Sequence, residues 1–227
     1  MKQSILNFAQ DRKYFQISQL KALLTSRNIS FAEDSIKKIV YYLKKEGKIF
    51  SAGRGWYSTI DHPFVLDKKP VQEIVDYLDK EFPLMYFSCW STEQLKLFYH
   101  HIQVRFVIFI YSETDYHPSI YERLRHKYSS VYLNPGKRDV ESAFIFDHKT
   151  VIIRPSISEE PQVNHYATIE KILVDLFIEG KKLQLLDEWE YQQVFQKIVD
   201  NYRVNMAKLI RYANRRNVKK EMLSIIH

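Results

Sequence analysis

Apolar residues at helical spacing predict three helices in the first fifty residues. The apolar positions of the first helix are Ile5, Phe8 and Ala9, and those of the second are Ile17, Leu20, Leu23 and Leu24. Ser18 is the predicted N-cap of the second helix. The third helix has the clearest boundaries, because Ser30 and Glu33 match a capping box and Gly47 supplies a C-terminal stop. Its apolar stripe is Ile36, Ile39, Val40 and Leu43.

A short hairpin is predicted directly after the third helix. Residues 48–59 combine the apolar Ile49 with the turn residues Gly53 and Gly55, and the segment closes on Trp56 and Tyr57. Three helices followed by a basic two-stranded hairpin, or wing, are typical of a winged helix-turn-helix, in which one helix enters the DNA major groove. The pattern therefore predicts this fold for residues 1–60.

The centre of the chain mixes helical and strand periodicity. Helices are predicted from Pro70 onward, over residues 91–101 and after Pro118, and strands over residues 85–89, 104–111, 130–133, 143–146 and 150–154. The strand 104–111 is almost continuously apolar, which indicates burial on both faces. Residues 147–149 are predicted to join the last two strands as a hairpin. This alternation is typical of an α/β arrangement.

From Ala167 to the C-terminus the pattern is helical. The first stripe is Ile169, Leu173, Leu176 and Phe177, and the second is Trp189, Val194, Phe195 and Ile198. Gly180 is predicted to end the first of these helices. The last stretch, from residue 202, has an apolar face formed by Val204, Leu209, Ile210 and Ala213.

Together these elements predict a mixed α/β (α+β) fold. The prolines at positions 63 and 70 interrupt the periodicity and mark a linker over residues 61–70. We therefore expect a winged helix-turn-helix DNA-binding domain over residues 1–60. An α/β domain that ends in a basic helical segment is expected over residues 71–227.

The charges are unevenly distributed. Residues 1–57 hold eleven Lys or Arg against four Asp or Glu, a surplus of seven that equals the net charge of the whole chain, +7. Residues 58–200 are acidic, with 16 basic against 22 acidic side chains, and residues 201–227 are basic again, with seven against one. Because nucleic acid attracts clustered cations, the basic N-terminal segment predicts binding to double-stranded DNA.

The third helix and the hairpin supply the candidate DNA-binding residues. A recognition helix places its N-terminal residues near base edges, where we expect Asp34, Ser35, Lys37 and Lys38. The same face continues with Tyr41, Lys44 and Lys45. Arg54, at the tip of the hairpin, is predicted to reach phosphate or the minor groove. Trp56 is a further candidate, although an aromatic residue in a wing more often packs back onto the helices. The alternative is a solvated helix face on a module that docks proteins.

A second candidate basic site lies in the C-terminal stretch. Its residues are Arg203, Lys208, Arg211, Arg215, Arg216 and Lys219. The cluster has three interpretations: a second DNA contact, a dock for an acidic protein or RNA, or the solvated face of an amphipathic helix.

Several classes of function lack their sequence signals. The single cysteine, Cys89, forms neither an internal disulfide nor a thiolate metal site, which suits a reducing cytosol. The N-terminus has no signal-peptide run, and the longest apolar run, residues 106–111, is too short to cross a bilayer. Phosphate-binding, dinucleotide-binding, serine-hydrolase and zinc-protease motifs do not occur in the sequence. We therefore expect a cytoplasmic protein without catalytic residues, cofactor, metal ion or membrane contact.

One enzymatic alternative stays open. Glu141, Asp147 and Lys149 loosely match the acidic residue and lysine arrangement of metal-dependent nucleases, in which carboxylates hold Mg²⁺. The same residues around position 148 have the composition of a tight turn between strands.

Four segments together resemble the AbiEi-type antitoxins of type IV toxin-antitoxin and abortive-infection systems. They are the end of the predicted wing, the helix 169–176, and the terminal segments 202–206 and 209–216. The family pattern has Arg-Thr where this chain has Lys171 and Ile172, which leaves Lys171 and Asp175 as counterparts of its charged positions. The resemblance covers nearly the whole chain and is weakest in its central part, between the predicted wing and residue 169.

The resemblance implies a function in two parts. In that family a winged helix binds repeats in the operon's own promoter, and a C-terminal domain counters a nucleotidyltransferase-like toxin. The sequence is therefore expected to be a DNA-binding transcriptional regulator of this kind. The main alternative is a winged-helix repressor whose α/β domain senses a ligand or mediates dimerisation, and the metal-dependent nuclease is the other.

Overall fold

The computed structural model describes residues 1–101, 105–137, 139, 147 and 149–226. The chain divides into two compact units, which are described separately. Unit 1 comprises residues 1–64 and 197–211, and unit 2 comprises residues 65–196 and 212–227. The predicted mixed α/β class is confirmed.

Helices and short strands alternate in the N-terminal part of unit 1. In chain order these elements are α1 (Lys2–Arg12), β1 (Tyr14–Gln16), α2 (Ile17–Ser26), α3 (Glu33–Lys45), β2 (Phe50–Ser51) and β3 (Trp56–Ser58). Among the described residues, β3 pairs antiparallel with both β1 and β2 in a sheet of order β1-β3-β2. The three helices cover this small sheet around a core that includes Ile5, Phe15, Leu20, Leu24, Ile36 and Leu43.

A distant segment completes unit 1. Residues 197–211 contain the end of α8 (Glu188–Asn201) and the start of α9 (Met206–Arg215). The Tyr14 hydroxyl donates to the carbonyl of Tyr202 at 2.7 Å and accepts from the backbone N–H of Val204 at 2.9 Å. The backbone of Arg203 bonds to His62 and Phe64, 2.6 and 3.1 Å away. The prediction assigned everything after residue 70 to one domain, so the structure differs from it at these fifteen residues (197–211).

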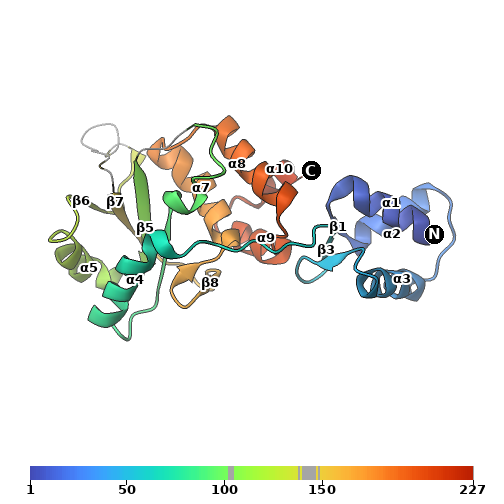
Figure 1. Cartoon of the computed structure of the whole chain (residues 1–227), viewed down its shortest axis with the longest axis horizontal. Coiled ribbons are helices and arrows are strands. Elements are labelled where there is room, and N and C mark those ends of the chain that lie inside the picture. Colours follow the sequence, from blue (N-terminus) through green and yellow to red (C-terminus); the bar gives the residue numbers. More distant parts are fainter. Residues whose placement is uncertain (102–104, 138, 140–146, 148, 227) are drawn as a thin grey trace. The chain divides into compact units, whose positions relative to one another are not determined.

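Unit 2 is built around a mixed sheet with helices on both faces (Figure 1). Its strands are β4 (Phe87–Ser91), β5 (Phe106–Ser112), β6 (Ser130–Leu133), β7 (Lys149–Pro155), β8 (Gln162–Val163) and β9 (Tyr166–Ala167). Within the described residues the order is β6-β7-β5-β4-β9-β8. Strands β5, β7 and β6 run parallel, and β4 runs antiparallel to β5.

The alternation of side chains along the strands separates the two faces of this sheet. One face, with Cys89, Ile108 and Ile153, packs against α4 (Lys69–Glu81) and α5 (His117–Leu124). The other face, with Tyr111 and Arg154, meets α7 (Ile169–Leu183) through side-chain contacts. Because β5 is covered on both sides, its continuous apolar run is explained. The last helix, α10 (Lys219–Ile226), inserts Met222 beside Tyr191 of α8.

Several predicted helix boundaries are wrong for local reasons. Helix α2 starts at Ile17 because Gln16 and Gln19 cap it reciprocally, so Ser18 is not its N-cap. Helix α3 starts at Glu33 with Ala32 as the capping residue, so Ser30 forms no capping box. Helix α7 continues through Gly180 to Leu183.

Two further expectations differ from the structure. The helix predicted over residues 91–101 is only a short 3-10 helix, η1 (Thr92–Leu95), followed by turns. The side chain of Gln94 caps this short helix: its oxygen accepts a hydrogen bond from the Ser91 N–H, and its amide nitrogen donates one to the carbonyl of Asp67. The C-terminal stretch forms two helices, α9 and α10, in place of one continuous pattern. The strand predicted over residues 143–146 lies outside the described residues.

Candidate nucleic-acid interface

Helix α3 buries one face and exposes a cationic one. Ile36, Val40 and Leu43 are 0 to 3% exposed because they pack into the core of unit 1. The opposite face carries the exposed side chains of Lys37, Lys38, Tyr41, Tyr42, Lys44 and Lys45. The amphipathic pattern read from the sequence therefore places all five predicted α3 side chains from Lys37 to Lys45 at the surface.

The cations of this face are largely free of intramolecular partners. Lys37 contacts the exposed carboxylate of Asp34 at 3.2 Å, an interaction that solvent weakens. In the described part of the chain, Lys38, Lys44 and Lys45 form no ion pair or hydrogen bond through their side chains. Ser35 is half-buried in the first turn. Charge that no acid neutralises remains available to an external anion.

Two aromatic side chains lie among these lysines. Tyr41 and Tyr42 are 62% and 54% exposed, and their rings meet edge to face with centroids 5.6 Å apart. Each tyrosine therefore offers an aromatic ring with a polar hydroxyl at the surface of α3. Tyr42 was missed by the sequence reasoning, although its position directly after Tyr41 was a visible signal.

The hairpin after α3 presents one cation at its tip. Arg54 is exposed between Gly53 and Gly55, whose φ angles of 102° and 78° allow the tight turn. Trp56, also predicted to contact DNA, is only 5% exposed and pairs with Gln16 in the sheet. That prediction is wrong: the indole belongs to the packing of unit 1, as aromatic residues near a turn often do.

The second candidate basic site separates into two groups. Arg203 stacks over the Phe50 ring at 4.9 Å, Arg215 binds Glu159 and Ser158, and Arg216 pairs with Asp175 at 3.3 Å. These three arginines make internal contacts, so they do not form one free basic surface. Lys208, Arg211 and Lys219 are exposed, and no hydrogen bond or ion pair of their side chains occurs within the described residues.

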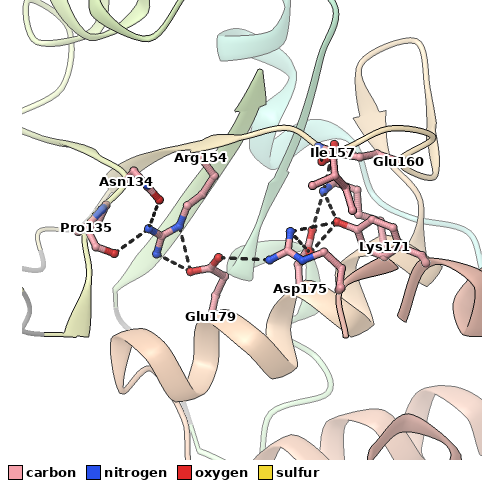
Figure 2. A network of polar contacts seen from close by, with 10 residues as sticks. Asn134, Pro135, Arg154, Ile157, Glu160, Lys171, Asp175 and Glu179 are labelled. Carbon is pink, nitrogen blue, oxygen red and sulfur yellow. Dashed lines mark hydrogen bonds and ion pairs between the residues drawn. The ribbon is translucent and has the colours of Figure 1, made fainter. Parts of the chain in front are cut away.

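Arg216 belongs to a network of charges inside unit 2. Figure 2 shows Arg154, Lys171, Asp175 and Glu179 of this network. Lys171 Nζ lies 2.7 Å from Asp175 and 3.2 Å from Glu160, and all three side chains are fully buried. Arg154 donates to Glu179 at 2.5 and 3.1 Å and to the Pro135 carbonyl at 2.7 Å. Lys171, Asp175 and Glu179 are spaced by four, which places them on one face of α7.

Two tyrosines, Tyr111 and Tyr212, contact Lys171 in this network. Tyr212 donates to Asp175 at 2.8 Å, and Lys171 Nζ lies 3.5 Å from the centre of the Tyr111 ring. Burial raises the pKa of Tyr212 well above its ordinary value, and the nearby Asp175 raises it further. Burial lowers the pKa of Arg216, but Asp175 and the other groups around it outweigh that effect and raise its pKa overall.

The network contains three cations and three carboxylates that satisfy one another. Sequence reasoning identified Lys171 and Asp175 but missed Glu160 and Glu179 as their partners, and it assigned Arg216 to a surface. The four-residue spacing along α7 was a usable signal for Glu179. Because its members are paired and at most 15% exposed, removing one of them would leave an uncompensated charge inside unit 2, and the network offers no open surface to a ligand.

The nuclease alternative finds little support around β7. Asp147 accepts a hydrogen bond from Ser129, Lys149 begins β7, and Glu141 lies outside the described residues. Among the residues that the structure describes, no group of three or more His, Cys, Asp or Glu is arranged to hold a metal ion.

The fold and the surface define a mixed α/β protein with a small basic unit of helices and hairpin. The chain belongs to the Family of unknown function (DUF6577), whose model matches residues 35–227. That match covers most of α3, the hairpin and all of unit 2. No curated protein matches the chain. None of the helices within the described ranges combines the length and apolar character required to cross a bilayer.

Proposed function

We propose that the chain is a DNA-binding transcriptional regulator that contacts double-stranded DNA through α3 and the following hairpin. The observation that supports this proposal best is the exposed face of α3, where lysines lie on both sides of two tyrosines and where, among the described residues, only Lys37 forms an ion pair. The order of helices and strands in unit 1 matches the arrangement in which a third helix enters the major groove and a hairpin flanks it.

The chemistry of the face suits this partner. Lysine and arginine neutralise phosphates and release counterions, which supplies affinity and makes binding salt-dependent. If α3 enters the major groove by its N-terminal end, Asp34 and Ser35 in its first turn would be next to the base edges. Tyr41 offers an apolar ring for contacts with sugars or with a thymine methyl group.

The test is a titration of the full-length protein with a labelled duplex from its own upstream region. Lys37→Ala together with Lys38→Ala is expected to weaken binding and to reduce the slope of log K against log salt by roughly 0.9 for each lost phosphate contact. Lys69→Ala with Lys80→Ala is the matched control, because it removes two exposed charges from α4 of unit 2. Equal slopes for both double variants would contradict the proposal.

The finer proposal follows the AbiEi resemblance: the protein represses its own operon and counters a nucleotidyltransferase-like toxin in the cytoplasm. It assigns no catalytic step to the chain. Two of the resembling segments, 169–176 and 209–216, are joined through the hydrogen bond of Lys171 to Tyr212 and the ion pair of Arg216 with Asp175. This supports a common core for the resembling segments.

Co-expression with the neighbouring gene tests the antitoxin role. Growth is expected to be rescued by the wild-type protein, and by the α3 double variant if neutralisation belongs to unit 2. A chain that binds its promoter but rescues no neighbouring toxin would instead favour a repressor with a sensing or dimerisation domain.

A further inference from the structure

A second cationic surface of unit 1 lies beside the hairpin. Residues 203–207 contact the hairpin at β2 and at the turn that follows it: Arg203 stacks on Phe50, and the N–H of Ala207 approaches the carbonyl of Ala52 at 3.4 Å. These contacts join residues about 150 positions apart, from the hairpin and from the segment that enters α9. The start of α9 therefore belongs to the same unit as the hairpin.

Gly53 is the point of closest approach. A Cβ built on Gly53 would overlap Asn205 Oδ1 and would lie 2.6 Å from Ala207 Cβ, so only glycine allows the two segments to pack this closely. The same Asn205 Oδ1 accepts from the backbone N–H of Lys208 at 3.1 Å and caps α9. Arg54 follows Gly53 in the chain, and Lys208 follows the cap. Arg54 and Lys208 therefore lie next to the contact that Gly53 of the hairpin makes with the start of α9.

The two segments that meet at this contact carry charges of one sign. Lys208 and Arg211 are three positions apart and share the exposed face of α9, whereas Met206 and Leu209 face the core. The sequence has no Asp or Glu in residues 47–60 or 201–211. Among the described residues, the side chains of Arg54, Lys208 and Arg211 form no hydrogen bond or ion pair.

We infer that Arg54, Lys208 and Arg211 form a second contact of unit 1 with the DNA phosphate backbone, an extended wing that includes the start of α9. The inference rests on the proposed function and adds to it two residues from the far end of the chain. Three cations on segments without Asp or Glu suit a polyanion, and the packing at Gly53 fixes the distance between the hairpin tip and the helix. Lys219 and Lys220, on α10 in unit 2, are not part of this surface.

Salt-dependent binding of the full-length protein to the labelled upstream duplex tests the inference. Lys208→Ala with Arg211→Ala is expected to reduce the slope of log K against log salt by about 1.8 for two lost phosphate contacts. The ratio of wild-type to variant affinity then changes about 12-fold between roughly 50 and roughly 200 mM salt. Lys219→Ala with Lys220→Ala removes two charges from α10 and is expected to leave the slope unchanged.

A second measurement uses the wild-type protein, so it does not depend on how a variant folds. Acetylation of lysine amines is followed with and without the duplex, and Lys208 is expected to be protected while Lys219 and Lys220 are not. The inference would be overturned if Lys208→Ala with Arg211→Ala left the slope unchanged and Lys208 were not protected from acetylation. If the α3 double variant still bound the duplex more weakly in that case, the proposed function would stand. If neither double variant alters binding, both fail.

Discussion

The two units use their charged residues in opposite ways. On α3 of unit 1 the lysine side chains are exposed to solvent, and among the described residues only Lys37 forms an ion pair, with the exposed Asp34. In unit 2, Lys171, Asp175 and Glu179 are buried, and each charge meets an opposite one. The same residue types are thus exposed to solvent in one unit, where we propose that they bind DNA, and paired with one another inside the other unit. Burial separates the two roles, because only a desolvated charge has to find its partner within the protein.

The largest expected effect comes from breaking the buried network. Lys171→Met keeps the length of the side chain but leaves Asp175 and Glu160 without their shared cation. We expect a loss of about 3–5 kcal/mol in the free energy of unfolding, the usual result of leaving buried charge uncompensated. Chemical denaturation measures it, and hydrogen exchange of the β5 and α7 amides assigns the loss to unit 2.

Lys38→Met is the matched control, because it makes the same change on the exposed face of α3. If both variants lost similar stability, the contrast between the buried and exposed lysines would be wrong.

Gly53→Ala is expected to have the next largest effect, and it lies in unit 1. The new Cβ meets Asn205 and Ala207, and φ of 102° is strained for any residue with a side chain. We expect a loss of roughly 2–3 kcal/mol, seen as faster hydrogen exchange in β2 and β3. Gly55→Ala is the control: φ is 78° but the space around it is open, so only the backbone strain of about 1 kcal/mol should remain. Equal losses would mean that residues 205–207 do not pack against the hairpin.

The sequence predicted those elements whose boundaries depend on local pattern. The start of helix α4, with proline in its first turn, and both ends of strands β5 and β6 were predicted to within two residues, because each has a clear local signal of proline or apolar residues. Helix α7 was predicted to stop at Gly180, but Leu186 packs 3.3 Å from the position where a Cβ would lie. Burial of the helix outweighs the modest helix penalty of one glycine.

The candidate interface was predictable in part. Its α3 residues follow from one amphipathic helix, so pattern sufficed for Lys37 and Lys38. The hydrogen bonds of Tyr14 to Tyr202 and of Lys171 to Tyr212 could not be predicted from the sequence, because the paired residues are 188 and 41 positions apart. A local pattern carries no information about such pairings, which tertiary packing decides.

Tyr14→Phe tests how residues 202–204 hold unit 1, with a smaller effect. The hydroxyl makes one buried and one partly buried hydrogen bond, and their loss should cost about 1–2 kcal/mol near neutral pH. Burial raises the pKa of Tyr14 to about 12, above its ordinary value of 10. Its contribution is therefore complete below about pH 10 and is lost as the pH rises towards 12.

The stability deficit of Tyr14→Phe should accordingly narrow between these pH values, since the variant lacks the group that titrates. Unfolding measured across that range checks it. A deficit independent of pH would show that Tyr14 is not buried as described.

The smallest effect on stability is expected from the residues with the proposed role in binding. Lys37→Ala with Lys38→Ala removes two exposed side chains from a helix, and alanine favours the helix slightly more than lysine does. We expect the free energy of unfolding to change by less than about 0.5 kcal/mol, while affinity for the upstream duplex falls and its salt dependence flattens. Measuring both quantities on the same preparation separates binding from folding. A variant that lost stability as well would show that these lysines contribute to the folded unit, and the contrast with Lys171 would then be one of degree.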